Sequence, residues 1–147
     1  MGDFVHLHVH TEYSLLDGAT RIDEVFASVK NKGMDALAIT DHGNMFGSLH
    51  FAKEAAKAGI KAIIGCELYL CDDYTKQEKG YVHLVLLCKN KIGYKNLVKL
   101  DSIAYVDGFY YKPRIDYKTL REHSEGLICP NNVPDGQTNL QNAGILA

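Results

Sequence analysis

The segment Phe4-Val-His-Leu-His-Val-His10 is the stretch from which the fold is inferred. Its residues alternate, so that Val5, Leu7 and Val9 share one face and the three histidines share the other, as the two-residue period of a β-strand requires. Histidines at positions i and i+2 of a strand are close enough to bind one metal ion. The spacing alone does not decide this, because a half-exposed strand can carry two histidines that bind nothing.

Beyond this segment, predicted strands alternate with predicted helices. Helical spacing of apolar residues predicts helices over 20–33, 48–58, 92–104 and 116–123, and short apolar runs predict strands over 36–40, 61–65, 81–88 and 126–128. Alternation with short connections favours parallel strands and an α/β fold. An open doubly wound sheet and a (βα) barrel both fit. The barrel is favoured because ionisable residues follow the strand ends, where such barrels place their chemistry.

The ionisable residues at these strand ends form a second pattern. Asp41 and His42 follow the second predicted strand, Glu67 follows the third, and His83 lies in the fourth. Histidine and carboxylate without a thiolate pattern suit zinc, manganese or iron. The four cysteines contain no CxxC pair, which argues against a zinc ribbon.

Composition narrows the functional classes. The chain has 147 residues, a formal net charge of -2 and 46% hydrophobic residues, values typical of one globular domain and not of a disordered or strongly nucleic-acid-attracting chain. No apolar run approaches the roughly 20 residues of a membrane helix. The N-terminus has no basic signal-peptide region. We therefore expect a cytoplasmic protein with no membrane partner.

Five motifs in order resemble a known family. They are residues 4–18, Thr40-Asp-His-Gly-Asn44 with Phe46-Gly47, Ile64-Gly-Cys-Glu67, His83-Leu-Val-Leu-Leu87 and Gly108-Phe-Tyr-Tyr-Lys-Pro-Arg-Ile-Asp116. Together they resemble the N-terminal polymerase-and-histidinol-phosphatase (PHP) domain of bacterial DNA polymerase III alpha subunits. The stretches Tyr13-Ser-Leu-Leu-Asp-Gly18 and Lys112-Pro-Arg-Ile-Asp116 are the ones that indicate the polymerase branch of the family.

The resemblance implies a fold and a metal centre. The fold would be a partial distorted (βα)7 barrel of PHP type, with parallel strands and metal ligands at the C-terminal rim. Two or three divalent ions (Zn, Mn or Fe) would be bound there. By the resemblance, the ligands are His8 and His10 for the first metal, Glu67 as the bridging carboxylate, His83 for the second, and Asp17 and His42 for the third. No side chain is assigned as the nucleophile, which would be a metal-bound water.

The resemblance also implies a function. The parent protein would be a DNA-directed DNA polymerase, a nucleotidyltransferase of DNA replication that uses Mg and has DNA and other replisome subunits as partners. Its PHP domain would be a hydrolase that removes nucleotides from DNA 3′ ends as a 3′-5′ exonuclease. Two alternatives stay open. One is a stand-alone PHP phosphoesterase such as histidinol phosphatase, and the other is a non-catalytic scaffold that binds the proofreading subunit.

The family pattern ends near residue 128. Residues 1–129 are therefore predicted to be a partial PHP domain, and 130–147 a polar tail foreign to the family and expected to be disordered. The family's next metal-ligating cysteine would fall at Val133, so Cys129 is not expected to be that ligand. Because this ligand and later ones are missing, we expect the 147-residue chain itself to be inactive.

Overall fold

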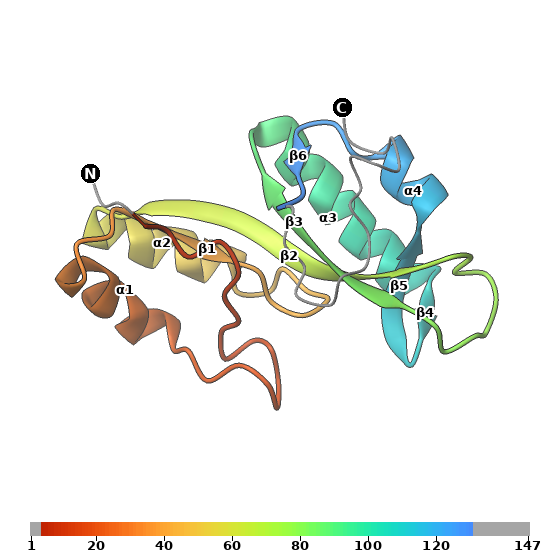
Figure 1. Ribbon diagram of the computed structural model, residues 1–147, viewed down its shortest axis with the longest axis horizontal. Coiled ribbons are helices and arrows are strands. Elements are labelled where there is room, and N and C mark those ends of the chain that lie inside the picture. Colours follow the sequence, from red (N-terminus) through yellow and green to blue (C-terminus); the bar gives the residue numbers. More distant parts are fainter. Residues whose placement is uncertain (1–3, 131–147) are drawn as a thin grey trace.

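The computed structural model describes residues 4–130, and the predicted polar tail from 131 onward lies outside this range, so the boundary at 129 stays a prediction. Within the described range, helices and strands follow one another as shown in Figure 1. Their bounds are α1 Ile22–Asn31, β1 Ala36–Ile39, α2 Ser48–Ala58, β2 Lys61–Cys71, β3 Val82–Cys88, α3 Lys91–Val106, β4 Phe109–Tyr110, β5 Lys112–Asp116, α4 Tyr117–Glu122 and β6 Leu127–Ile128. None of these helices is long and apolar enough to span a membrane.

The long strand β2 connects two parts of the molecule (Figure 1). Residues 61–64 of β2 pair in parallel with β1. Residues 65–70 pair with β3, and residues 69–71 pair in parallel with β5. The strand order is β4-β5-β2-β3-β6, with β1 beside the first part of β2. The fold is α/β, as predicted, but its sheet is mixed.

The prediction of parallel strands is wrong for three of the five strand pairings within residues 4–130. The pairs β2–β3, β3–β6 and β4–β5 are antiparallel. For β2 and β3 the reason lies in their connection, residues 72–81, which contains no helix. A chain that returns directly lies antiparallel to the preceding strand, whereas a parallel neighbour needs a crossover, usually a helix.

The position of Glu67 also differs from the prediction. The strand predicted over 61–65 continues to Cys71, so Glu67 lies in the middle of β2 and not at a C-terminal rim. The residues on both sides of Glu67, Cys66 and Leu68, are fully buried. An apolar environment on both sides of the strand lets β2 continue through the acid, provided that the carboxylate finds partners.

The opening segment 4–10 does not form the regular strand that its alternation predicts. It runs beside β1, with the amide of Ala38 donating to the carbonyl of His6 at 3.0 Å and the amide of Thr40 donating to that of Val9 at 2.9 Å. The amide of Val9 instead donates to the Thr40 hydroxyl at 2.8 Å. A side chain therefore takes the place of a carbonyl, and the regular ladder is interrupted.

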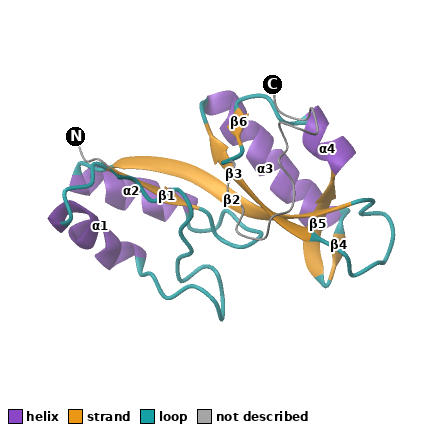
Figure 2. Ribbon diagram, in the orientation of Figure 1, coloured by secondary structure: helices purple, strands orange, loops and turns teal. Residues whose placement is uncertain are grey.

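Two large apolar cores lie at the two ends of β2, and Figure 2 shows the helices of each core around its end of the strand. The first joins α1, β1 and α2 around Phe26, Leu37 and Phe51. The second joins β3 and α3 around Leu86 and Leu97, and it includes residues of β2, β5, α4 and β6. Full burial of one such side chain stabilises the fold by about 1.5–3 kcal/mol relative to exposure. The two cores fix the positions of the loops between them.

Arg114 on β5 fastens the loop that connects β2 to β3. Its side chain is almost fully buried. The guanidinium nitrogens donate to the carbonyls of Glu78 at 2.7 Å, Lys76 at 3.0 Å and Tyr74 at 3.1 Å. Carbonyl oxygens thus satisfy a buried cation that would otherwise be costly to desolvate.

Candidate metal centre

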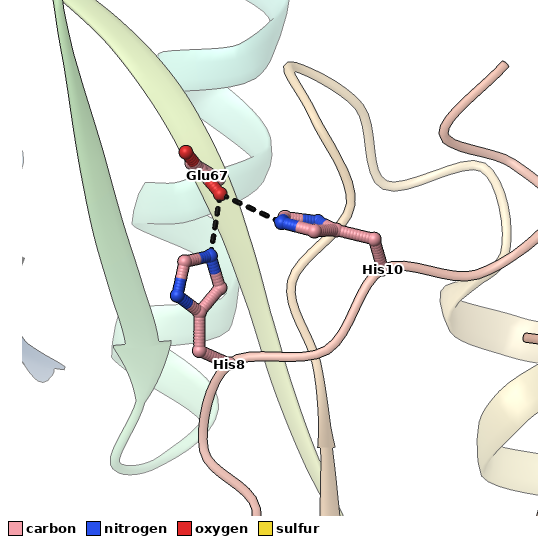
Figure 3. Close-up of side chains that lie close together, drawn as sticks. All are labelled: His8, His10 and Glu67. Carbon is pink, nitrogen blue, oxygen red and sulfur yellow. Dashed lines mark hydrogen bonds and ion pairs between the residues drawn. The ribbon is translucent and has the colours of Figure 1, made fainter. Parts of the chain in front are cut away.

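Glu67 is a buried carboxylate at the middle of β2, only 4% exposed. It is paired with Val85 on β3 and bridged to His42, which follows β1. Four imidazole nitrogens approach its oxygens, namely His8 Nε2 at 2.6 Å, His10 Nε2 at 3.1 Å, His83 Nδ1 at 3.3 Å and His42 Nδ1 at 3.8 Å. Figure 3 shows His8 and His10 pointing toward the same carboxylate oxygen. Segments far apart in the chain therefore converge on one acid.

His8 and His10 owe their positions to the residue between them. Two hydrogen bonds hold the backbone of Val9 against Thr40. The Val9 carbonyl accepts from the Thr40 amide, and the Val9 amide donates to the Thr40 hydroxyl. The hydroxyl of Thr40 also donates to the Val9 carbonyl at 3.1 Å. Because Val9 is held at this point, the histidines on either side of it both reach Glu67 although the segment is not a regular strand.

His42 is placed by the turn after β1 and paired with Asp17. Its amide donates to the Ser14 hydroxyl at 3.1 Å. Its ring Nε2 lies 2.7 Å from a carboxylate oxygen of Asp17. Asp17 is the most exposed member of the predicted ligand set, and its contact with the cluster is this one to His42. The structure thus brings all six predicted residues into one region, and their role as metal ligands stays a prediction.

Asp41 supports the site without entering it, a role that sequence reasoning missed. Its carboxylate accepts hydrogen bonds from the Thr11 amide at 2.6 Å and hydroxyl at 2.7 Å, and from the Ser14 hydroxyl at 2.6 Å. These bonds tie the turn after His10 to the end of β1. The signal available in the sequence is the adjacency of Asp41 to His42, and this adjacency does not reveal the contact with the Thr11 turn.

The electrostatics of the cluster favour an ionised Glu67. Burial alone would raise the pKa of Glu67, but hydrogen bonds from His10 and His8 and the nearby His42 imidazole outweigh burial and lower it well below its ordinary value. The hydrogen bond to Glu67 raises the pKa of His10, against the effect of burial. Burial lowers the pKa of His42, which favours its neutral form. Ionised Glu67 and neutral His42 are thus in the forms that ligate metals, whereas a metal bound by His10 would displace the proton that Glu67 favours there.

The donor set fits a divalent cation. Two overlapping groups share Glu67: His8 with His10, and His42 with His83, and in each group the donor atoms lie within 4.8 Å of one another. Within residues 4–130, the Nδ1 atom of His42, which faces Glu67, is buried and lacks a hydrogen-bond partner. Buried polar atoms without partners call for an explanation, and a bound cation provides one. Imidazole and carboxylate donors suit zinc, manganese or iron.

Comparison with known proteins extends these findings. Residues 6–142 match the family described as "PHP domain". DNA polymerase III subunit alpha of Treponema pallidum is 52% identical over 140 residues, and that of Borreliella burgdorferi is 54% identical over 132 residues. These alignments cover 91% and 86% of this chain. They cover only 12% of each relative, so the chain spans a small part of their length.

A solved structure has a fold similar to that of most of this chain. An amidohydrolase from Chromobacterium violaceum, described with bound sulfate and no metal, superposes with a TM-score of 0.52 and 28% sequence identity. The superposition covers 69% of this chain and 33% of the amidohydrolase chain. The likeness therefore concerns most of the chain and about a third of the other protein.

Proposed function

The chain belongs to the PHP domain family, and from this premise we propose that it is part of the PHP domain of a bacterial DNA polymerase III alpha subunit. The identity to two such subunits supports this proposal. The whole protein would then be a replicative DNA-directed DNA polymerase that uses Mg²⁺. Its partners would be DNA and the other replisome subunits, and its compartment the cytoplasm.

For the domain itself, the proposed activity is phosphoester hydrolysis at DNA 3′ ends, the 3′-5′ exonuclease reaction. The single observation that carries it is the convergence of four imidazoles on the buried carboxylate of Glu67. Two or three divalent ions (Zn, Mn or Fe), when bound, would polarise a phosphoryl oxygen and a water molecule as Lewis acids. The distorted (βα)7 barrel of the family, with 1–129 as its PHP segment, is part of the same proposal.

The chain's own residues have separate tasks in this site. His8 and His10 would hold one ion with Glu67, and His83 a second. We assign His42 to the second ion too, and not with Asp17 to a third as the resemblance implies, because its donor atom groups with those of Glu67 and His83. Nε2 of His42 lies 2.7 Å from the Asp17 carboxylate, so a neutral ring that donates from Nε2 would turn the lone pair of Nδ1 toward Glu67. A carboxylate that orients an imidazole in this way also raises its basicity as a ligand.

Metal binding by the 147-residue chain tests the proposal. Titration with Zn²⁺ or Mn²⁺ in a calorimeter is expected to show binding, and Glu67→Gln is expected to weaken it by about 100-fold or more because both donor groups lose their shared oxygen. Glu122→Gln, at an exposed position of α4, is the matched control and should bind like the unaltered chain. Equal binding by the two variants would contradict the proposal.

A further inference from the structure

A cavity of about 280 Å³ adjoins the candidate metal centre. His42 forms part of its wall, so the cavity and the cluster share a residue. The remaining wall includes Tyr13, Asn44, Phe46, Tyr69, Tyr105 and Lys112. Its volume is just below the range of about 300–1,000 Å³ typical of small-molecule sites. The cavity is therefore large enough for one flat ring system but not for an extended ligand.

Two aromatic rings of this wall offer free faces. Phe46, in the turn before α2, is 66% exposed, and Tyr105 on α3 is 39% exposed. Their ring centroids are 6.1 Å apart and their planes are inclined by 42°, so neither ring is stacked on the other. Exposed aromatic faces that meet at a cavity favour a ligand with its own π-face, and nucleobases are such ligands.

A buried amide fixes this wall in place and joins it to the cluster. Asn44 is 6% exposed. Its side-chain nitrogen donates to the carbonyls of His42 at 3.0 Å and Tyr13 at 3.1 Å, and its oxygen accepts from the amide of Phe46 at 3.2 Å. One side chain therefore sets the positions of a cluster histidine and of two aromatic residues. Such preorganisation lowers the entropic cost of binding a ligand.

Lys112 brings a positive charge to the same cavity. Its ammonium lies over the ring of Tyr69, 5.3 Å from the centroid. Tyr69 is itself buried, so the ring is a fixed support. Among the residues that the structure describes, no carboxylate lies within ion-pair distance of Lys112. Its charge is thus available to an anion. A cation beside exposed aromatic rings suits a nucleotide, which carries both a phosphate and a base.

We propose that this cavity binds the base of an unpaired nucleotide against Phe46 and Tyr105, with the phosphate of that nucleotide at Lys112. An ester bound in this way would lie on the side of the cavity wall formed by His42, and this part of the inference rests on the proposed hydrolytic function. The base must be unpaired, because a base inside a duplex is stacked on both faces. Stacking accepts any base, so the site selects single-stranded ends without reading their sequence.

Nucleotide binding without metal tests the cavity separately from hydrolysis. The 147-residue chain is titrated in EDTA with deoxyadenosine 5′-monophosphate, and chemical shifts are followed by NMR. Saturable shifts are expected at the cavity residues. Phe46→Ala and Tyr105→Ala should each weaken binding by about five-fold or more, because stacking on one aromatic ring supplies that much affinity, and Tyr105→Phe should restore it.

Two controls sharpen the test. Phe109→Ala removes a 56% exposed ring that lies 6.1 Å from the Tyr105 ring but not in the cavity wall, and it should leave binding unchanged. Lys112→Ala should weaken binding of the nucleotide but not of deoxyadenosine, which lacks the phosphate.

Three results would overturn the proposal. The first is equal affinity of the three aromatic-to-alanine variants, and the second is a set of shifts outside the cavity. The third is self-association of the chain that Phe46→Ala abolishes in sedimentation equilibrium, which would make the ring pair a contact between two copies. Absence of metal binding with nucleotide binding retained would count against the proposed function alone. Metal binding without nucleotide binding would count against this proposal alone.

Discussion

The carboxylate of Asp101, on α3, has a buried oxygen atom. Its Oδ1 is inaccessible to solvent and has no hydrogen-bond partner within residues 4–130. Burial raises the pKa of Asp101 to about 7, although a backbone hydrogen bond at Met45 opposes the shift. In the unfolded chain the same group has a pKa of about 3.9. Between these two values the folded chain holds a proton that the unfolded chain has lost.

The free energy of unfolding should therefore fall as pH rises through this window, because the unfolded state binds fewer protons. Asp101→Asn removes the charge that is buried above pH 7. We expect this variant to be more stable than the unaltered chain by about 1–2 kcal/mol at pH 8, and the difference to vanish near pH 4. Urea unfolding at both pH values measures it. Asp107→Asn, at the exposed end of the same helix, should show no such pH-dependent gain.

At the residue scale, the sequence predicted which side chains form the cluster around Glu67, but not which residues support it. Motif spacing and the family resemblance named six residues, and the structure places them around Glu67 and His42. The supporting role of Asp41 could not be predicted, because it depends on how the turn at Thr11 and Ser14 folds back on β1. The cavity beside His42 was equally hidden, since its wall combines residues from separate segments.

Gly93 shows how closely two elements pack. It lies in the first turn of α3, where its amide donates to the side chain of Asn90, the N-cap residue. A Cβ atom at this position would collide with the backbone carbonyl of Gly126, just before β6. We expect Gly93→Ala to lower the free energy of unfolding by about 2–3 kcal/mol, because neither backbone segment can move away without disturbing its own element.

The matched control is Gly80, in the loop before β3. A Cβ atom there would have no atom within 4 Å. Gly80→Ala should change the stability by no more than about 0.5 kcal/mol. Thermal unfolding of the two variants distinguishes a steric effect at α3 from a general effect of replacing glycine. A similar loss in both would contradict this account of the α3 packing.

At the element scale, the existence of helices and strands could be predicted better than their pairing. Periodic apolar residues identified α1 to α4 and most strands. Strand direction depended on the connection 72–81, whose lack of a helical pattern was a usable signal for an antiparallel return. The continuation of β2 through Glu67 could not be read from periodicity, because a single acid inside an apolar run normally marks the end of a strand.

For the whole molecule, the cluster lies where the two cores meet. Glu67 lies on β2 between them, His42 follows β1, and His83 lies on β3. A cation held by both sides should therefore couple the two cores. We expect Zn²⁺ at 100 times its dissociation constant to add about 2.7 kcal/mol of stability. This addition should slow amide exchange in α1, α2 and α3 alike.

Native-state hydrogen exchange with and without Zn²⁺ measures this coupling. Slower exchange in one core only would show that the ion is held by one side. Glu67→Gln should abolish the slowing in both cores, since it removes the oxygen that the two donor groups share. The unaltered chain in EDTA serves as the reference for the variant.

The Arg114 guanidinium has a consequence for proteolysis. Lys76 and Lys79 lie in the exposed loop between β2 and β3 and offer trypsin two cleavage sites. Cleavage requires a stretch of backbone to detach and enter the protease, so its rate follows the local free energy of opening. Three carbonyls of this loop are bonded to one buried side chain. This charged loop should thus resist digestion until its carbonyls separate from the Arg114 side chain.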